Sequence, residues 1–308
     1  MRPIASDLFT PARVAALVAR AAMRLLIVAV FLAPAGLAAA GDWARAAPSP
    51  LPDGLTIPSY APGPMPLHRG EQLVFRASWI GIPAAEARIV VNGDDKDPRM
   101  WMGEVWVRTS PGVDLLYKLR DYLREEFSRA SLAPRDMYIK QTENRRNSEY
   151  RLSFDRSARL VTAVKRNKRG SATSRYSSNY PFGPVSGAIM ALSQPLSVGQ
   201  KLRFDVFSAR SRYVIDFIVA AREQITTPLG DFDALRIIPT IAYISDKAAS
   251  KTARQTTLWV SADQRHLPLR IETTAFVGKM RADLVQVGNM PAPSVLPARP
   301  TPIAPPDR

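Results

Sequence analysis

The sequence contains no cysteine among its 308 residues and only two histidines, His68 and His266. The lack of cysteine excludes disulfides, thiolate nucleophiles, cysteine-ligated zinc or iron–sulfur clusters, and a lipid attached through an N-terminal cysteine. The chain also lacks a Gly-rich dinucleotide loop, a Walker loop, a His-Glu-x-x-His motif and a Gly-x-Ser-x-Gly elbow. His68 adjoins a proline-rich stretch, and His266 is expected in a turn after Asp263. We therefore predict a non-enzymatic protein with no catalytic residue, no metal site and no cofactor.

Acidic residues are few relative to basic ones. The 27 Asp and Glu stand against 42 Lys and Arg, which gives a formal net charge of +15 at pH 7. This charge favours contact with anionic surfaces without identifying the anion. Hydrophobic residues make up 46% of the chain and charged residues 22%, which is enough apolar material for a sizeable core. Disorder of the whole chain is therefore excluded.

The N-terminus has the pattern of a secretory signal peptide. Arg13, Arg20 and Arg24 precede an apolar run from Leu25 to Leu37, and small residues follow at positions 38–41. The run is shorter than the roughly 18 to 20 apolar residues that a membrane-crossing helix needs, and no later stretch is long enough either. We expect residues 1–40 to be a signal peptide and the mature protein to be exported, into the periplasm of a Gram-negative bacterium. The pattern also allows an uncleaved N-terminal anchor, and Met23 is an alternative start.

Proline marks both ends of the mature chain. Of the 27 prolines, seven lie in residues 47–66 and seven in residues 289–308. Proline lacks an amide donor and fixes its own φ, so these segments cannot supply long helices or central strands. We predict a proline-rich linker over residues 41–66, one folded domain over residues 67–287 and a disordered tail over residues 288–308.

Alternation of period two dominates the predicted domain and indicates strands with one buried face. Glu71–Trp79 and Ala85–Val91 form a predicted hairpin, and short connections separate the later strands. Two segments, Gly112–Arg120 and Pro184–Leu192, have helix-like spacing instead. We predict a mainly β fold: a strongly curved antiparallel sheet or incomplete β-barrel of about eight to twelve strands, with one or two short helices.

Three motifs resemble a known family. They are the run Gly-Glu-Gln-Leu-Val-Phe-Arg-Ala-Ser-Trp-Ile-Gly-Ile-Pro-Ala at residues 70–84, Leu132-Ala133-Pro134, and Leu258–Asp263 followed by Leu267–Arg270. In order and separation they resemble the DUF3108 family of bacterial exported proteins, whose members have no assigned biochemical function. The resemblance implies an exported β-rich domain over nearly all of residues 67–287. The family's Asp–Ser-containing helical stretch is replaced here by Gly183–Gly187, so a role tied to that stretch is not carried over.

Four tryptophans lie in strand patterns and are candidates for contacting a ligand: Trp79, Trp101, Trp106 and Trp259. One packed tryptophan buries about 200 Å², so a role in the core or on a sheet face is the alternative. Trp101 and Trp106 are five positions apart and must point to opposite faces of a regular strand. One of these two is a candidate for lining a cavity or contacting a partner.

Basic residues are concentrated between Lys140 and Arg175, where eleven of them stand against three acidic residues. If Glu149–Phe154 and Arg159–Lys165 form a hairpin, two basic clusters lie at adjacent strand ends. The predicted anionic-surface patch consists of Arg145, Arg146, Lys165, Arg166, Lys168 and Arg169. In an exported protein its partners would be anionic lipid, lipopolysaccharide or acidic glycan, with peripheral membrane contact and without nucleic acid. The alternative is a solvated loop on a protein that is basic throughout.

Three functions fit these observations. The first is a non-enzymatic envelope protein whose curved sheet binds an amphipathic or anionic ligand. The second is a hydrolase that acts on envelope polysaccharide through carboxylates such as Glu125 or Asp263, which requires two acidic groups in one pocket. The third is a structural or assembly module that uses its proline-rich tail as a tether. The sequence leaves the ligand and the oligomeric state open.

Overall fold

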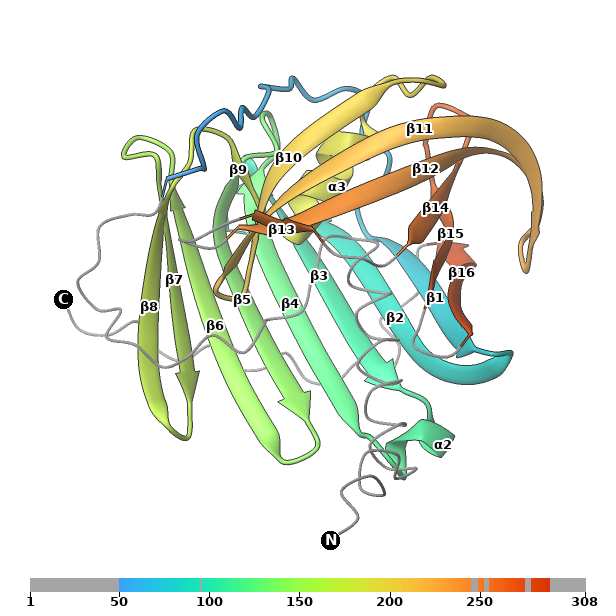
Figure 1. Cartoon of the computed structure of the whole chain (residues 1–308), viewed down its shortest axis with the longest axis horizontal. Helices are drawn as coiled ribbons and strands as arrows, with labels where there is room; N and C mark the ends of the chain where they lie inside the picture. Colours follow the sequence, from blue (N-terminus) through green and yellow to red (C-terminus); the bar gives the residue numbers. More distant parts are fainter. Residues whose placement is uncertain (1–49, 95, 245–248, 252–254, 275–277, 289–308) are drawn as a thin grey trace, which may run out of the picture.

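The computed structural model describes residues 50–94, 96–244, 249–251, 255–274 and 278–288. Over these residues the chain forms one sixteen-stranded sheet that curls around a single helix and does not close into a barrel (Figure 1). This confirms the predicted fold class. The predicted signal peptide, and the predicted tail beyond Gly288, lie outside the described residues.

The sheet order is β8-β7-β6-β5-β4-β3-β2-β1-β16-β15-β14-β12-β11-β10-β9, with β13 beside β12. All neighbours pair antiparallel except β9 and β10, which pair parallel. The first strands are β1 (Glu71–Trp79), β2 (Ile82–Gly93), β3 (Met100–Thr109), β4 (Leu119–Ser128), β5 (Pro134–Glu143), β6 (Arg146–Asp155), β7 (Leu160–Asn167), β8 (Gly170–Ser177) and β9 (Pro181–Phe182). The remaining strands are β10 (Lys201–Ser208), β11 (Ser211–Thr227), β12 (Gly230–Ile244), β13 (Ala249–Lys251), β14 (Thr256–Ser261), β15 (Pro268–Thr274) and β16 (Lys279–Gly288).

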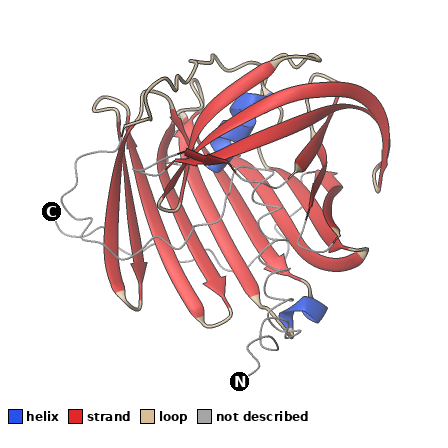
Figure 2. Cartoon of the chain, viewed as in Figure 1, coloured by secondary structure: helices blue, strands red, loops and turns tan. Residues whose placement is uncertain are grey.

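Two short helices accompany the sheet in the described residues: α2 (Pro111–Asp114) and α3 (Pro184–Leu192) (Figure 2). The helix predicted over Pro184–Leu192 is confirmed. The segment Gly112–Arg120, predicted as a short helix or an irregular connection, contains most of the one-turn α2 and a turn, because from Leu119 the chain already pairs with β5 as β4. No helix in these described ranges is both long and apolar enough to cross a membrane.

The expectation of eight to twelve strands is wrong. Sixteen form in the described residues, and those that the prediction missed are the short β9 and β13, the polar β8 and the ten-residue β16. The predicted hairpin of β1 and β2 is present, with Leu73 opposite Ile89 and Phe75 opposite Ala87. These four side chains are buried in one core cluster on the inner face of the sheet. Alternation therefore fixed which side chains face inward, since successive residues of a strand point to opposite faces.

The two ends of the sheet meet through side chains instead of a backbone ladder. Tyr176 of β8 donates its hydroxyl to the carbonyl of Arg210, which precedes β11, at 2.6 Å, and its ring lies 5.4 Å from that of Phe207. Ser178, just after β8, donates to the carboxylate of Asp205 on β10 at 2.5 Å. This seam, defined by Tyr176, Ser178, Asp205, Phe207 and Arg212, closes the core where backbone pairing stops.

A buried ion pair lies at the centre of the seam. The Arg212 guanidinium donates to both carboxylate oxygens of Asp205, at 2.9 and 2.6 Å. The two side chains are 1% and 0% exposed. Burial raises the pKa of Asp205 although Arg212 and Ser178 act in the opposite direction. The guanidinium also lies 5.3 Å from the ring of Phe207. Removal of one partner would leave a buried charge without compensation.

We predict that Arg212→Met lowers the free energy of unfolding by about 3 to 5 kcal/mol, because Asp205 is left as an unpaired buried carboxylate. Urea titration followed by circular dichroism measures the change. The double variant Arg212→Met/Asp205→Leu should recover much of the loss, since it removes both charges. A loss below about 1 kcal/mol in the single variant would contradict a structural role for the pair.

Candidate functional site

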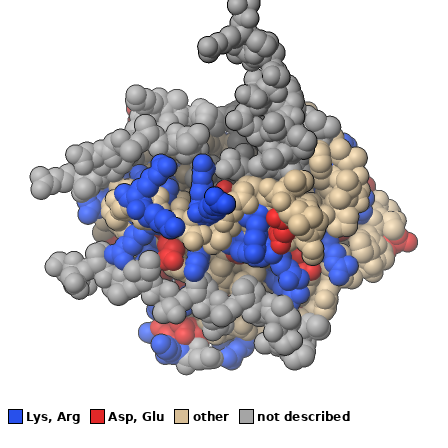
Figure 3. All heavy atoms as spheres, turned by 90° about the horizontal axis from the view of Figure 1, so that it is seen from below, with Lys and Arg blue, Asp and Glu red and all other residues tan. Residues whose placement is uncertain are grey.

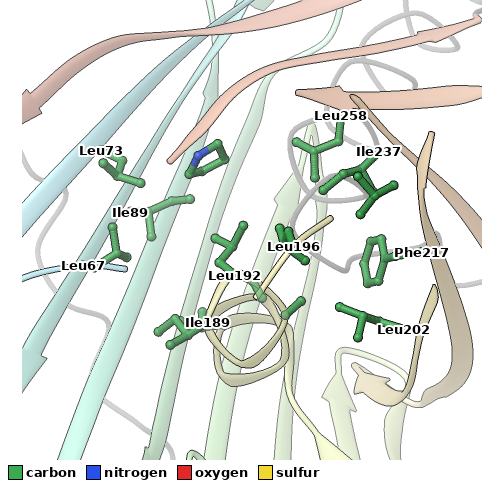
Figure 4. Close-up of a pocket in the computed structure, with 15 residues that line it drawn as sticks. Leu67, Leu73, Ile89, Ile189, Leu192, Leu196, Leu202, Phe217, Ile237 and Leu258 are labelled. Carbon is green, nitrogen blue, oxygen red and sulfur yellow. The ribbon is translucent and has the colours of Figure 1, made fainter. Parts of the chain in front are cut away.

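A cavity of about 60 Å³ lies between α3 and the inner face of the sheet. Figure 4 shows apolar side chains of β1 and β2 on one side, those of β10 and β11 on the other, and α3 between them. Every residue that lines the cavity is apolar: Leu67, Leu73, Ile89, Val185, Ala188, Ile189, Ala191, Leu192, Leu196, Leu202, Phe217, Val219, Ile237, Leu258 and Pro268. The site therefore suits a hydrocarbon group and offers no polar side chain for chemistry.

The position of α3 is set at its N-terminus by Glu125 of β4. One carboxylate oxygen of Glu125 accepts the Val185 amide at 2.8 Å, and the other accepts the Ser186 amide at 3.2 Å. A carboxylate is favoured there because the first amides of a helix have no partner within it and carry partial positive charge. Glu125 is fully buried, and burial raises its pKa to about 7, while the hydrogen bonds from Ser186, Val185 and Gly183 oppose the rise.

Two glycines make this contact possible. A Cβ on Gly103 of β3 would lie 2.5 Å from Cγ1 of Val185, and one on Gly183 would lie 2.3 Å from the carboxyl carbon of Glu125. Contacts this short do not occur between real side chains, so a larger residue at either position would push α3 away from the sheet. The glycine at 183 also belongs to the Gly183–Gly187 stretch that the sequence comparison with the family singles out.

The C-terminal end of α3 is held by His266. The Nδ1 atom of His266 lies 2.8 Å from the carbonyl oxygen of Leu192. Carbonyl groups in the last turn of a helix have no partner within the helix. The His266 amide donates to the carbonyl of Asp263 at 3.2 Å, and His266 has a φ of 45°. The prediction that His266 is a turn residue is therefore confirmed, and its ring has the further role of fixing α3.

Part of the segment predicted as a linker packs against the same end of α3. The Gly63 amide donates to the Ser193 hydroxyl at 3.2 Å, and Gln194 donates to the Ala61 carbonyl at 3.0 Å. The ring of Tyr60 stacks on Phe204 with centroids 4.8 Å apart. Residues 60–63 thus contact the folded domain, and the predicted domain boundary at residue 67 stays a prediction.

The four candidate tryptophans do not converge on the cavity, and none is among the residues that line it. Trp101 is buried in the inner core, and Trp79 packs half-buried against that core. Trp259 donates its ring N–H to Glu223 at 2.6 Å. Their predicted ligand contacts stay a prediction.

Trp106 lies apart from the inner core, in a second buried cluster with Tyr122 and Tyr138. The rings of Trp106 and Tyr122 are 5.4 Å apart, and those of Tyr122 and Tyr138 are 6.3 Å apart. Among the residues that the structure describes, the Trp106 ring nitrogen finds no hydrogen-bond partner. Trp101 and Trp106 therefore do face opposite sides of β3, as their spacing predicts.

The predicted basic patch gathers at one end of the sheet. Pairing of Ser148 with Asn167 places the β5–β6 turn beside the β7–β8 turn, and Figure 3 shows basic side chains on this end of the molecule. Four of the six residues are exposed: Arg145, Arg146, Lys168 and Arg169. Arg166 is half-buried, and the half-buried Lys165 lies 5.7 Å from the ring of Tyr150. What the patch binds stays a prediction.

The two carboxylates considered for hydrolysis do not line the cavity. Both oxygens of Glu125 are engaged by α3, and Glu126 contacts Arg124 and Arg135 instead, as expected for neighbours on opposite faces. Asp263 accepts the Ser261 hydroxyl at 2.7 Å and the Arg265 amide at 3.0 Å within a turn. A ligand on the curved sheet was expected from the sequence, but the residues that line this cavity were not identified there.

We predict that Glu125 makes stability depend on pH. The pKa of Glu125 in the folded protein, about 7, exceeds the ordinary value of 4.5 for a glutamate. Between these values the unfolded chain loses this proton and the folded chain keeps it. The stabilising contribution is therefore complete below about pH 4.5, falls up to about pH 7 and is constant above, a loss of about 3 kcal/mol.

Urea titrations from pH 4 to 8 on the wild type and Glu125→Gln measure this contribution as a difference. In Glu125→Gln, the free energy of unfolding should not show the fall that Glu125 causes between about pH 4.5 and pH 7. Burial also raises the pKa of Asp121, but Asp121 is common to both proteins and cancels. Parallel pH profiles would rule out the assigned role of Glu125.

Comparisons with known proteins give a family match and several similar solved structures. Nothing matches among curated proteins. A β-barrel-like protein of the domain of unknown function DUF1849 from Brucella abortus is similar in structure, with 10% identity and a TM-score of 0.47, over 74% of this chain and 98% of that chain. A protein described as exported, with a YmcC-like fold, from Bacteroides fragilis has 13% identity and a TM-score of 0.30, over 74% and 99%. A protein described as a lipoprotein from Parabacteroides distasonis has 12% identity and a TM-score of 0.31, over 75% and 100%.

The family comparison covers most of the folded domain. A family model described as "Protein of unknown function (DUF3108)" matches residues 74–285, which include β2 to β15 and most of β1 and β16. This span contains most of the residue 70–84 motif and all of the motif at residues 258–270, so the resemblance stated from the sequence is confirmed. The chain belongs to the DUF3108 family.

Proposed function

We propose that this protein is a non-enzymatic component of the bacterial envelope, exported to the periplasm, that holds the apolar end of an amphipathic ligand between α3 and the sheet. The observation that carries the proposal is the lining of the cavity, which is apolar throughout. An apolar cavity of this kind stays dry and gains free energy when hydrocarbon enters it. The signal-peptide pattern before residue 41 supports the location.

The size of the cavity limits what it accepts. Its volume of about 60 Å³ has room for roughly four groups the size of a water molecule. That matches the end of an acyl chain and is too little for a sugar or a nucleotide. The remainder of the ligand, including any head group, would lie outside the cavity.

The side of the cavity formed by α3 is the one through which a chain would enter. Ala188, Ala191 and Leu192 of α3, and Leu196 after it, are only half-buried, whereas the strand residues opposite are buried. Glu125 and His266 hold the two ends of α3, so the position of the helix beside the entrance is fixed. A preformed site avoids the cost of ordering on binding.

The proposal predicts that filling the cavity blocks binding. Ala188→Leu places three more carbons against the lining and should weaken binding of the fluorescent fatty acid cis-parinaric acid by roughly tenfold or more, since a few buried methylenes are worth about 0.8 kcal/mol each. Fluorescence titration of delipidated protein gives the affinity. Native mass spectrometry of the wild type purified from the envelope should show a bound acyl compound.

Ala220→Leu is the matched control, because Ala220 is exposed on β11 and does not line the cavity. Its affinity should equal that of the wild type. Equal affinities in all three proteins, or a wild type that neither binds the fatty acid nor carries a lipid, would refute the proposal.

A further inference from the structure

One end of the sheet exposes large apolar side chains on its turns. Ile80 and Ile82, at the β1–β2 turn, are 57% and 60% exposed. Leu115 and Leu116, directly after α2, are 87% and 51% exposed. Ile80 also has a φ of 49°, a conformation that is strained for a β-branched residue. Folding explains neither the exposure nor the strain, because polar residues and glycine serve better in turns.

These turns form one continuous edge. The Ser110 hydroxyl donates to the Pro83 carbonyl at 2.8 Å, which joins the β3–β4 connection to the start of β2. The Lys118 amide donates to the Asn144 side chain at 2.8 Å, which joins the same connection to the β5–β6 turn. The β7–β8 turn follows through the pairing of β6 with β7. We call residues 80–83, 110–118, 144–146 and 167–170 the lower edge, after its place in Figure 1.

The charge of the lower edge is positive. Its exposed cations are Lys118, Arg145, Arg146, Lys168 and Arg169. Asp114, its acidic residue, is paired with Arg120, so it does not offset them. Seen from below in Figure 3, basic side chains are spread over this end of the molecule.

A partner for the lower edge has to bind both the exposed apolar side chains and the exposed cations. An acidic glycan would satisfy the cations, but it gains nothing from four exposed apolar side chains. The surface of an anionic bilayer satisfies both, because its head groups attract Lys and Arg while apolar side chains enter the boundary of the acyl region. We propose that the lower edge docks on an anionic lipid bilayer, with Ile80, Ile82, Leu115 and Leu116 inserted and the basic residues on the head groups.

This docking does not depend on the cavity, since no residue of the lower edge lines it. The test is sedimentation of the exported protein with vesicles of phosphatidylcholine alone or with one quarter phosphatidylglycerol. Binding should require phosphatidylglycerol and weaken as salt is added. The double variant Arg145→Gln/Arg146→Gln should reduce partitioning of the protein onto these vesicles by about thirtyfold, at about fivefold for each charge removed.

The apolar half of the docking is tested separately. Leu115→Ser/Leu116→Ser should reduce partitioning by roughly tenfold or more without loss of fold, because both side chains are exposed. Val198→Ser is the matched apolar control, at 57% exposure in a turn outside the lower edge. Lys96→Gln/Lys201→Gln is the matched charge control, because both lysines are exposed and lie outside the lower edge. Both controls should bind as the wild type does.

Three results would overturn the proposal. The first is a wild-type protein that does not bind anionic vesicles but is retained on heparin, which would indicate that the cations bind an acidic glycan. The second is full vesicle binding by the Leu115→Ser/Leu116→Ser variant, which would show that electrostatic attraction alone causes the binding. The third is a dimer in sedimentation velocity that the same variant converts to a monomer, with no vesicle binding, which would assign the edge to a second copy of the chain.

Discussion

The contact between the Glu125 carboxylate and the first amides of α3 is the constraint on which the inner site depends. A curved sheet leaves its concave face open unless something fills it, and here α3 does so. Because the helix is only nine residues long, its own hydrogen bonds would not hold it in place. The buried carboxylate fixes its N-terminus, the small residues at 103 and 183 allow the close approach, and His266 fixes its other end. The cavity is what remains between a helix so placed and the strands around it.

The alternation of apolar residues was sufficient to predict the curved antiparallel sheet, the β1–β2 hairpin and the buried face of these two strands. Helix spacing was sufficient for α3, because Pro184 begins it and its apolar side chains recur over nine residues. The same spacing overextended α2, since pairing of β4 with β3 and β5 outweighs local preference from Leu119 onward. The polar edge strand β8 has no buried face that a pattern could reveal. Local sequence therefore predicted most elements with a buried face, missed β16, and failed where pairing alone defines the strand.

The cavity could not be predicted by the same reasoning. Its lining comes from α3, seven strands and the segments around Leu67 and Leu196, and each contributes the apolar residues that a filled core would also use. Whether such residues meet or leave a gap depends on distances that no sequence period encodes. Glu125 illustrates the same limit. Strand geometry is enough to place Glu125 and Glu126 on opposite faces of β4. It does not indicate the partners of Glu125, because Val185 and Ser186 lie some 60 positions away in the sequence.

The seam lies where backbone pairing of the sheet stops, whereas the lower edge consists of turns that connect its strands. At the seam, Tyr176 and the ion pair of Asp205 with Arg212 replace a missing ladder by side-chain contacts, so that end of the core is sealed from within. At the lower edge, turns that normally carry polar residues present isoleucine and leucine to the solvent. Exposed apolar groups add little to folding, since more than half of the surface of each stays in water in the native state. Their contribution to free energy appears only when a second surface covers them, which is why the lower edge belongs to binding and the seam to stability.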